Sequence, residues 1–227
     1  MTAPRSILII GASRGLGLGL ASEFAAQGWA VTATVRSAAQ QAPLQELGAR
    51  VEQLEMTDPA SLEQLAGRLN GQSFDVIFVN AGVAGPDHHS TAQATAEEMG
   101  QLFLTNAVAP LRVAERLLPN LNAEHGLIVI MSSILGSIET GAGMGMPLYG
   151  ASKAALNHLA QCFVRGQDNP KLGVLLMHPG WVRTDMGGAN APLDIDSSCK
   201  GMVEQISTAV GHPGLRYLDY QGTALPW

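Results

Sequence analysis

The chain has 227 residues, of which 46% are hydrophobic and 14% are charged, and its net charge is −6. It is therefore long enough to bury a core and too apolar for a disordered chain, while its acidity argues against nucleic acid or an anionic membrane held by bulk electrostatics. The two cysteines have no metal-ligand spacing and the first apolar run, 7–10, is too short for a signal peptide or a membrane span, so we expect a protein of the reducing cytoplasm.

Apolar runs alternate with helical patterns along the whole chain. In chain order we predict a strand at 7–10, a helix at 16–27, a strand at 30–35, a short helix at 44–47, a strand at 49–54, a helix at 58–69, a strand at 74–79, a helix at 97–121 kinked at Pro110, a strand at 127–131, a helix at 147–165, a strand at 173–177, a helix at 195–210 and a strand at 215–218.

This alternation predicts an α/β fold, a Rossmann-type doubly wound parallel sheet of about seven strands with helices on both faces. No repeat or linker interrupts the pattern. We therefore expect a single domain over residues 1–227, with a small substrate loop and helix region at about 181–210. Ligands of such sheets bind beyond the carboxyl ends of the strands, so candidate groups at those ends should converge on one edge.

A glycine-rich stretch with the spacing G-x-x-x-G-x-G stands between the first strand and the first helix. It reads Gly11-Ala12-Ser13-Arg14-Gly15-Leu16-Gly17. Small residues let the backbone approach a pyrophosphate, and the N-terminus of the helix presents free N–H groups to it. The position after the first strand favours a dinucleotide site, although any strand-to-helix turn can use glycines in this way.

Tyr149 and Lys153 stand four residues apart in a predicted helix, so they share one face. Lowering the tyrosine pKa by about three units from its ordinary value near 10 costs about 4 kcal/mol. A cation at roughly 4–5 Å supplies about 3–4 kcal/mol at an effective dielectric constant near 20. The pair therefore predicts a phenol of lowered pKa that acts as a general acid or base, whereas an isolated pair of this kind is more often a solvated helix face.

The motifs together resemble the short-chain dehydrogenase/reductase family from about residue 7 to 185. They occur in the family's order: the glycine stretch, Asn80-Ala81-Gly82, Asn106, Ser133, Tyr149-x-x-x-Lys153 and Pro179-Gly180. The stretches 131–138, 179–188 and 220–227 also resemble the C-factor-like and sniffer-like carbonyl reductases, which are small NADP-preferring members. The resemblance implies an NADPH-dependent oxidoreductase that transfers hydride to a ketone, aldehyde or quinone, and a homodimer or homotetramer.

Four catalytic residues follow from the resemblance. Tyr149 gives a proton to the carbonyl oxygen, and Ser133 hydrogen-bonds that oxygen as charge develops on it. Lys153 lowers the pKa of Tyr149 and binds the nicotinamide ribose, while Asn106 supports a water that links Lys153 to solvent. Two alternatives stay open. Ser132 is a second candidate for the catalytic serine, and the alternative role of Asn106 is to bind helix backbone that the kink at Pro110 leaves without a partner.

The implied cofactor site includes the glycine stretch and the Tyr149–Lys153 pair. Its other members are Asn80, Ala81, Gly82, Pro179, Gly180, Val182 and Thr184, of which the last meets the nicotinamide carboxamide. Many family members have an aspartate after the third strand, at the adenine; here Glu55 takes that place, one methylene longer, followed by Met56.

Charge predicts which dinucleotide binds. Arg36 stands at the end of the second strand with no acid nearby, and Arg14 lies inside the glycine stretch. Two guanidiniums suit a dianionic 2′-phosphate, whereas an NAD site needs a carboxylate there. The sequence therefore favours NADP(H) and leaves NAD(H) open.

The sequence also gives expectations about what surrounds this site. We expect a small carbonyl or alcohol substrate in an apolar pocket lined by Met144, Met146, Trp181 and Met186, with an inserted loop at 141–146. The adjacent His88 and His89 have no evident third ligand, so no metal is expected. The alternative to an enzyme is a cofactor-loaded signalling or sensing module of the C-factor type with little turnover, which has no need of the acid/base pair. An epimerase or dehydratase is disfavoured because only about 40 residues follow Thr184.

Overall fold

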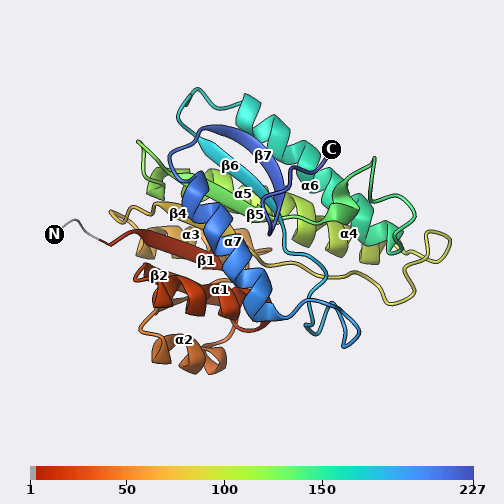
Figure 1. The fold of residues 1–227 in the computed structure, drawn as a ribbon, viewed down its shortest axis with the longest axis horizontal. Coiled ribbons are helices and arrows are strands. Elements are labelled where there is room, and N and C mark those ends of the chain that lie inside the picture. Colours follow the sequence, from red (N-terminus) through yellow and green to blue (C-terminus); the bar gives the residue numbers. More distant parts are fainter. Residues whose placement is uncertain (1–3) are drawn as a thin grey trace.

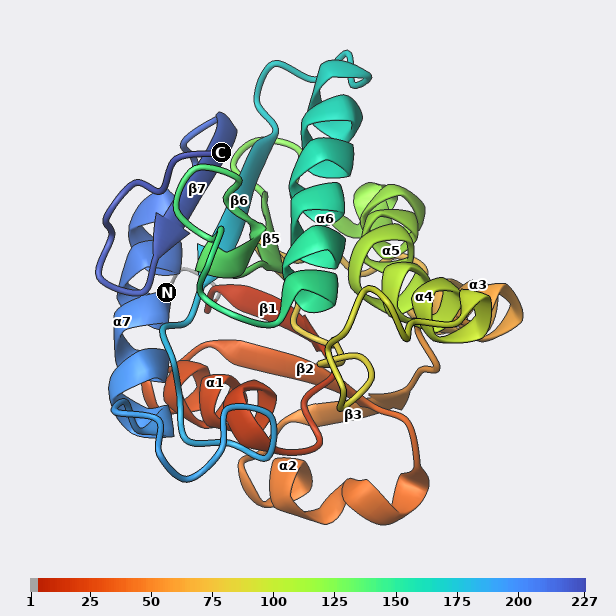
Figure 2. The same ribbon diagram turned by 90° about the vertical axis from the view of Figure 1, so that its right-hand side faces the viewer.

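A seven-stranded parallel sheet forms the centre of the molecule (Figures 1 and 2). The computed structural model describes residues 4–227. The strand order is β3–β2–β1–β4–β5–β6–β7, which confirms the predicted Rossmann-type sheet. The strands are β1 (Ser6–Ile10), β2 (Ala30–Val35), β3 (Arg50–Gln53), β4 (Val76–Val79), β5 (Leu127–Met131), β6 (Gly173–His178) and β7 (Gly214–Asp219).

Helices cover both faces of this sheet (Figure 2). They are α1 (Gly15–Ala26), α2 (Ala42–Glu46), α3 (Pro59–Arg68), α4 (Ala96–Phe103), α5 (Ala109–Leu117), α6 (Pro147–Arg165) and α7 (Ile195–Ala209), with short 3-10 turns η1 (Ala38–Gln40), η3 (Leu118–Asn120) and η4 (Ile134–Gly136). Helices α1, α2 and α7 pack on one face, and α3, α5 and α6 pack on the other. Within residues 4–227 no helix combines the length and the apolar character that a membrane crossing requires.

The central strands are buried on both faces, which explains their continuous apolar sequences. Ile7 and Ile9 of β1 point into the core beneath α1 and α7, while Leu8 and Ile10 point into the core beneath α3, α5 and α6. All four side chains are at most 1% exposed. Successive side chains alternate between the faces because a strand has a period of two residues.

The long helix predicted at 97–121 is interrupted, but before Pro110 rather than at it. Helix α4 passes into a π-helical segment, η2 (Leu104–Val108), and Pro110 then stands in the first turn of α5. The N–H of Ala109 reaches the carbonyl of Leu104, five residues back. Pro110 has no N–H, so the carbonyl of Asn106 lacks its usual donor four residues on, and the wider turn accommodates this loss.

The glycine stretch forms the tight turn from β1 into α1. Gly11 has a φ of 86°, and a Cβ placed on it would lie 2.7 Å from the Cβ of Ala81. A Cβ on Gly17 would lie 2.1 Å from the Gly11 carbonyl oxygen. The turn is held from both sides: the Gly11 N–H donates to the Thr34 hydroxyl (3.0 Å), and Asn80 Nδ2 donates to the Gly11 carbonyl (2.7 Å).

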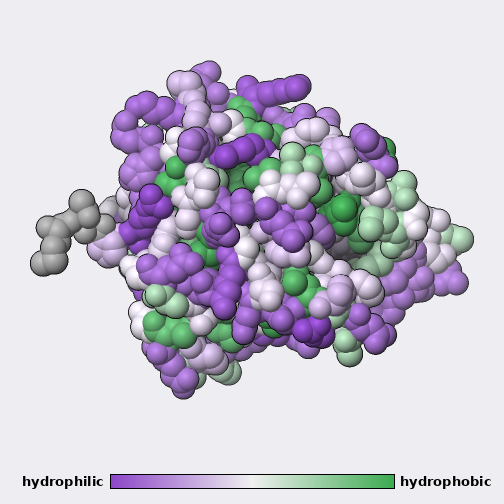
Figure 3. Space-filling view, viewed as in Figure 1, coloured by the Kyte–Doolittle hydropathy of each residue, from purple (hydrophilic) through white to green (hydrophobic). Residues whose placement is uncertain are grey.

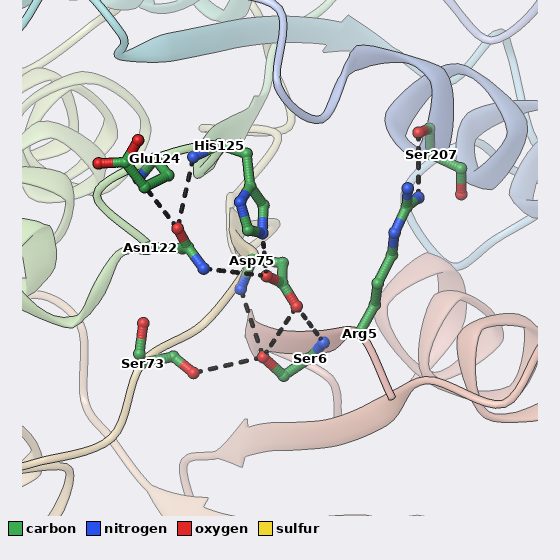
Figure 4. A network of polar contacts seen from close by, with 8 residues as sticks. All are labelled: Arg5, Ser6, Ser73, Asp75, Asn122, Glu124, His125 and Ser207. Atoms are coloured by element: carbon green, nitrogen blue, oxygen red, sulfur yellow. Dashed lines mark hydrogen bonds and ion pairs between the residues drawn. The ribbon is translucent and has the colours of Figure 1, made fainter. Parts of the chain in front are cut away.

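A polar network closes the opposite edge of the sheet, where the strands begin (Figure 4). Asp75 accepts hydrogen bonds from the N–H of Ser6 (2.7 Å) and the hydroxyl of Ser6 (3.2 Å), and its other oxygen lies 2.7 Å from His125 Nε2. The carboxylate stands between the serine and the histidine, whereas a Ser-His-Asp triad places the imidazole in the middle. This network therefore ties β1, β4 and β5 together and is not a hydrolytic site.

A pair of glycine substitutions should separate the tight turn from an open helix position. We expect Gly17→Ala to lower the free energy of unfolding by about 1–3 kcal/mol, because its Cβ would overlap the Gly11 carbonyl. Gly67→Ala is the matched control, since it lies in α3 with no atom within 4 Å of an added Cβ, and it should be neutral or raise stability by about 0.5–1 kcal/mol. Urea unfolding of both variants measures the difference, and equal stabilities would contradict the turn geometry.

The carboxylate of Asp75 is a second stability test. Asp75→Ala should lower the free energy of unfolding by about 1–3 kcal/mol, because the N–H of Ser6 loses its acceptor in a place where the carboxylate is only 14% exposed. Glu124→Ala removes an exposed carboxylate that pairs with Lys171 on the same side of the molecule, and it should leave the unfolding midpoint unchanged. A null result for Asp75→Ala in thermal or chemical denaturation would show that the network is dispensable.

Candidate active site

The predicted site residues meet at the carboxyl edge of the sheet. In Figure 1 the loops that follow β4, β5 and β6 lie together on the right-hand side of the molecule. Figure 3 shows apolar residues around a hollow on that same side. Exposed apolar side chains of these loops are Ile138, Met144, Trp181 and Met186.

Tyr149 and Lys153 project from the first two turns of α6, as their spacing predicts. The Lys153 ammonium lies 5.7 Å from the centre of the Tyr149 ring. In this structure burial raises the pKa of Tyr149 to about 12, and a hydrogen bond with the Ser133 side chain offsets only part of that rise. The expectation of a depressed tyrosine pKa is therefore wrong for the protein by itself, because removal of the phenolate from water outweighs its neighbours.

The ammonium group of Lys153 is buried and is hydrogen-bonded to the backbone. Its side chain is 2% exposed, and its ammonium donates a hydrogen bond to the Met131 carbonyl at 2.8 Å. Burial lowers the pKa of Lys153 to about 8, so its positive charge is held at neutral pH and lost at mildly alkaline pH. The ammonium also lies close to Gly82, where an added Cβ would be 3.6 Å from Nζ.

Asn106 lies in the π-helical segment and is fully buried. Its side-chain amide forms two hydrogen bonds with the backbone of Val83: Oδ1 accepts from the Val83 N–H (2.9 Å), and Nδ2 donates to the Val83 carbonyl (2.8 Å). Nδ2 also donates to the Ser152 hydroxyl at 3.0 Å. The side chain thus fixes the loop after β4 next to Gly82 and Lys153, and it does not bind helix backbone freed by Pro110.

The two serines after β5 have different surroundings. The Ser132 hydroxyl is 1% exposed and donates to Asn157 Oδ1 at 2.6 Å. The Ser133 side chain forms a hydrogen bond with the Tyr149 phenol. Its hydroxyl oxygen also accepts a hydrogen bond from the Leu135 N–H at 3.2 Å. Of the two, only Ser133 faces the phenol.

The glycine turn and the end of β4 have residues that fit a dinucleotide. Gly11 and Gly17 leave no room for side chains, and Asn80 and Ala81 press against them at the end of β4. Gly82 continues this wall toward Lys153. Backbone exposed by glycine at the N-terminus of a helix is the donor set that a pyrophosphate requires.

The segment after β6 lies next to the glycine turn. Pro179 is anchored by the Ser198 hydroxyl, which donates to its carbonyl at 2.6 Å, and Gly180 has a φ of 83°. Val182 is buried. Thr184 accepts the Gly187 N–H at 3.0 Å and lies near the glycine turn, since an added Cβ on Gly15 would be 3.8 Å from its methyl group.

The two predicted phosphate-binding arginines are placed differently. Arg14 forms an ion pair with Asp185, and both side chains are largely exposed. Arg36 is exposed at the end of β2 and lines a polar cavity of about 270 Å³ with Glu55, Ser61 and Arg68. A 2′-phosphate at the end of β2 would therefore meet a free guanidinium in Arg36 and one in Arg14 that already has an anionic partner.

The two residues predicted near the adenine make contacts within the protein. Glu55 lies at the end of β3, where its carboxylate accepts from the Thr57 N–H (3.1 Å) and hydroxyl (2.8 Å). Met56 is 4% exposed and belongs to the core beneath α3. Its side chain therefore packs, and only its backbone remains for a ligand. Ser13 and Leu16 are partly exposed in the glycine turn.

The histidine and cysteine side chains show no metal site. Within residues 4–227 no group of three His, Cys, Asp or Glu side chains is arranged to hold a metal ion. His88 is engaged by the Ser90 N–H (2.9 Å) and by Glu98 (3.4 Å). Cys199 is buried and Cys162 is exposed, and both are free thiols.

Sequence reasoning missed three contributors to the site. Thr34 anchors the glycine turn, Asn157 engages Ser132, and Tyr217 donates a hydrogen bond to the carbonyl of Ser133. Thr34 could have been noticed as a polar residue at the end of a buried strand. No sequence signal pointed to Tyr217, which lies 84 residues from its partner.

Comparison with known proteins agrees with this geometry. A family model for short chain dehydrogenases matches residues 5–192. The chain is 35% identical over 154 residues to C-signal of Myxococcus xanthus, covering 67% of this chain and 92% of that protein. It superposes with a TM-score of 0.94 on a putative short-chain dehydrogenase/reductase from Burkholderia multivorans with bound NADP, at 40% identity over 99% of this chain and 100% of that one. For the carbonyl reductase Sniffer of D. melanogaster the TM-score is 0.86, at 30% identity over 99% and 100% of the two chains.

The family match spans most of the chain, and the glycine turn, the Tyr149–Lys153 pair and the parallel sheet occur together in one structure. The relatives include both the C-signal protein and the Sniffer reductase, as the resemblance predicted. The chain therefore belongs to the short-chain dehydrogenase/reductase family and is an NAD(P)-dependent oxidoreductase.

Proposed function

We propose that the protein reduces a small carbonyl compound with NADPH and that Tyr149 donates the proton. The observation that carries this proposal is the meeting of the Tyr149 phenol, the Ser133 hydroxyl and the buried Lys153 ammonium at the carboxyl edge of the sheet. Two similar proteins of known structure, a putative short-chain dehydrogenase/reductase with bound NADP and a carbonyl reductase, support the same reaction class.

Burial prepares Tyr149 to give a proton in the reductive direction. A phenol with a pKa near 12 is fully protonated at neutral pH, so the proton is present when the substrate arrives. The nicotinamide, when bound, supplies the hydride to the carbonyl carbon. The Ser133 hydroxyl then hydrogen-bonds the carbonyl oxygen as negative charge grows there, and Tyr149 transfers its proton to that oxygen, which is a much stronger base than a phenolate.

Lys153 stabilises the phenolate that this transfer leaves behind. With a pKa of about 8, the ammonium keeps its charge at neutral pH. At 5.7 Å from the ring it contributes about 3 kcal/mol at an effective dielectric constant near 20. This stabilisation of the phenolate opposes the rise in the tyrosine pKa that desolvation causes. Asn106 holds the Val83 loop beside this pair, and its water-relay role remains our proposal.

The apolar rim indicates the body of the substrate. Met144, Trp181 and Met186 are exposed in the loops that border the site, and Ile138 follows Ser133 on the same side. Exposed side chains of this size favour a carbonyl compound with an apolar or aromatic body, and the unbranched methionines can adapt to different shapes.

Removing the phenol hydroxyl tests the proton donor. Tyr149→Phe should lower kcat for NADPH-dependent carbonyl reduction by about 100-fold or more, because the developing oxyanion loses its acid. Its Kd for NADPH should stay within about threefold of wild type, measured by quenching of protein fluorescence. Tyr220→Phe removes the same hydroxyl outside the catalytic set and should keep wild-type kcat. Full turnover by Tyr149→Phe would refute the role, and NADPH binding by wild type without turnover of any carbonyl in a panel would favour a sensing module.

Reversing one charge tests the choice of dinucleotide. Arg36→Asp should lower the ratio of kcat/KM for NADPH to that for NADH by at least about tenfold, because a carboxylate repels the 2′-phosphate and accepts from a ribose 2′-hydroxyl. Arg165→Asp makes the same change in net charge at the end of α6 and should leave the ratio unaltered. If both variants keep the wild-type ratio, Arg36 does not read the phosphate.

A further inference from the structure

Tyr217 joins β7 to the loop that carries Ser133. Its ring is 3% exposed, and its hydroxyl donates a hydrogen bond to the Ser133 carbonyl. It also lies close enough to Tyr149 to affect that phenol electrostatically. Tyr217 is therefore a buried tyrosine next to the residues of the proposed site.

The hydrogen bonds of Ser133 show what this contact does. Its carbonyl accepts from two donors, the Tyr217 hydroxyl and the Gly136 N–H (2.8 Å). Its hydroxyl oxygen accepts from the Leu135 N–H at 3.2 Å. Because the lone pair is used in this way, the hydroxyl proton is free to point at Tyr149 or at a substrate oxygen. Tyr217 thus helps to fix the peptide from which that hydroxyl projects.

The same tyrosine is itself held by the segment that follows β7. The chain turns back so that the Leu225 N–H donates to the Tyr217 carbonyl at 2.9 Å. The Trp227 ring packs on the Tyr217 ring with 5.4 Å between their centres. An aromatic contact of this kind restricts the orientation of the phenol.

We propose that Tyr217, held by Trp227, is a positioning residue that aims the Ser133 hydroxyl at the reacting oxygen. This inference rests on the proposed function for its kinetic consequence, but the position of Ser133 can be observed without any turnover. Loss of the Tyr217 hydroxyl leaves the Ser133 carbonyl with its Gly136 donor, so the fold survives the change while the serine loses one of its restraints.

The first test is a double-mutant cycle in kcat. Tyr217→Phe keeps the ring and its contact with Trp227, and it should lower kcat about tenfold. This loss is smaller than the roughly 100-fold loss expected when the Ser133 hydroxyl is removed. Because Tyr217 acts through Ser133, the same change in a Ser133→Ala background should have little further effect. An equal tenfold loss in both backgrounds, or a wild-type kcat for Tyr217→Phe, would overturn the proposal. Ile7→Val, a core change on β1 away from the site, controls for a general loss of stability.

The second test does not depend on activity. Crystal structures of wild type and Tyr217→Phe, each with NADP bound, should show the Ser133 hydroxyl moved away from Tyr149 in the variant only. If wild type reduces no carbonyl in the panel, the proposed function fails, and this comparison still decides whether Tyr217 positions the serine. A Ser133 hydroxyl in the same place in both structures would refute the inference.

Discussion

The burial of one ammonium group organises the catalytic edge of this protein. Lys153 reaches the end of β5 from the second turn of α6 and gives a hydrogen bond to the Met131 carbonyl. A charge in this position must be compensated, since an unpaired buried ion is strongly disfavoured. The carbonyl provides part of the compensation, and the nearby face of Tyr149 provides a further favourable contact. Helix α6, β5 and the loop after β4 are therefore held in one arrangement around that group.

The same burial changes how the tyrosine works. The sequence predicts that the positive charge of Lys153 lowers the pKa of Tyr149. In the structure desolvation shifts each group toward its neutral form, the pKa of the phenol upward and that of the amine downward. In the proposed mechanism the resting phenol therefore keeps its proton, and the cation stabilises the negative charge that develops during proton transfer. The mechanism we propose thus relies on stabilisation of the transition state more than of the ground state.

The parts of the molecule that depend on local sequence were predictable. The continuous apolar runs of the central strands revealed burial on both faces, and α6 has the predicted bounds because Pro147 opens it and the apolar face persists to Arg165. What could not be predicted depends on contacts between distant segments. The buried Asn106 side chain binds the backbone of Val83, 23 positions away, and the Tyr217–Ser133 bond joins residues 84 positions apart. No local pattern encodes those distances.

The ion pair between Arg14 and Asp185 has a consequence for how a dinucleotide enters. It joins the glycine turn to the loop after β6, segments 171 residues apart in the chain. If Arg14 binds the 2′-phosphate, as the sequence predicts, binding becomes an exchange of one anion for another, and the favourable free energy is only the difference between the two pairings. Asp185 then acts as an internal competitor for the guanidinium and is released to solvent once the phosphate takes its place.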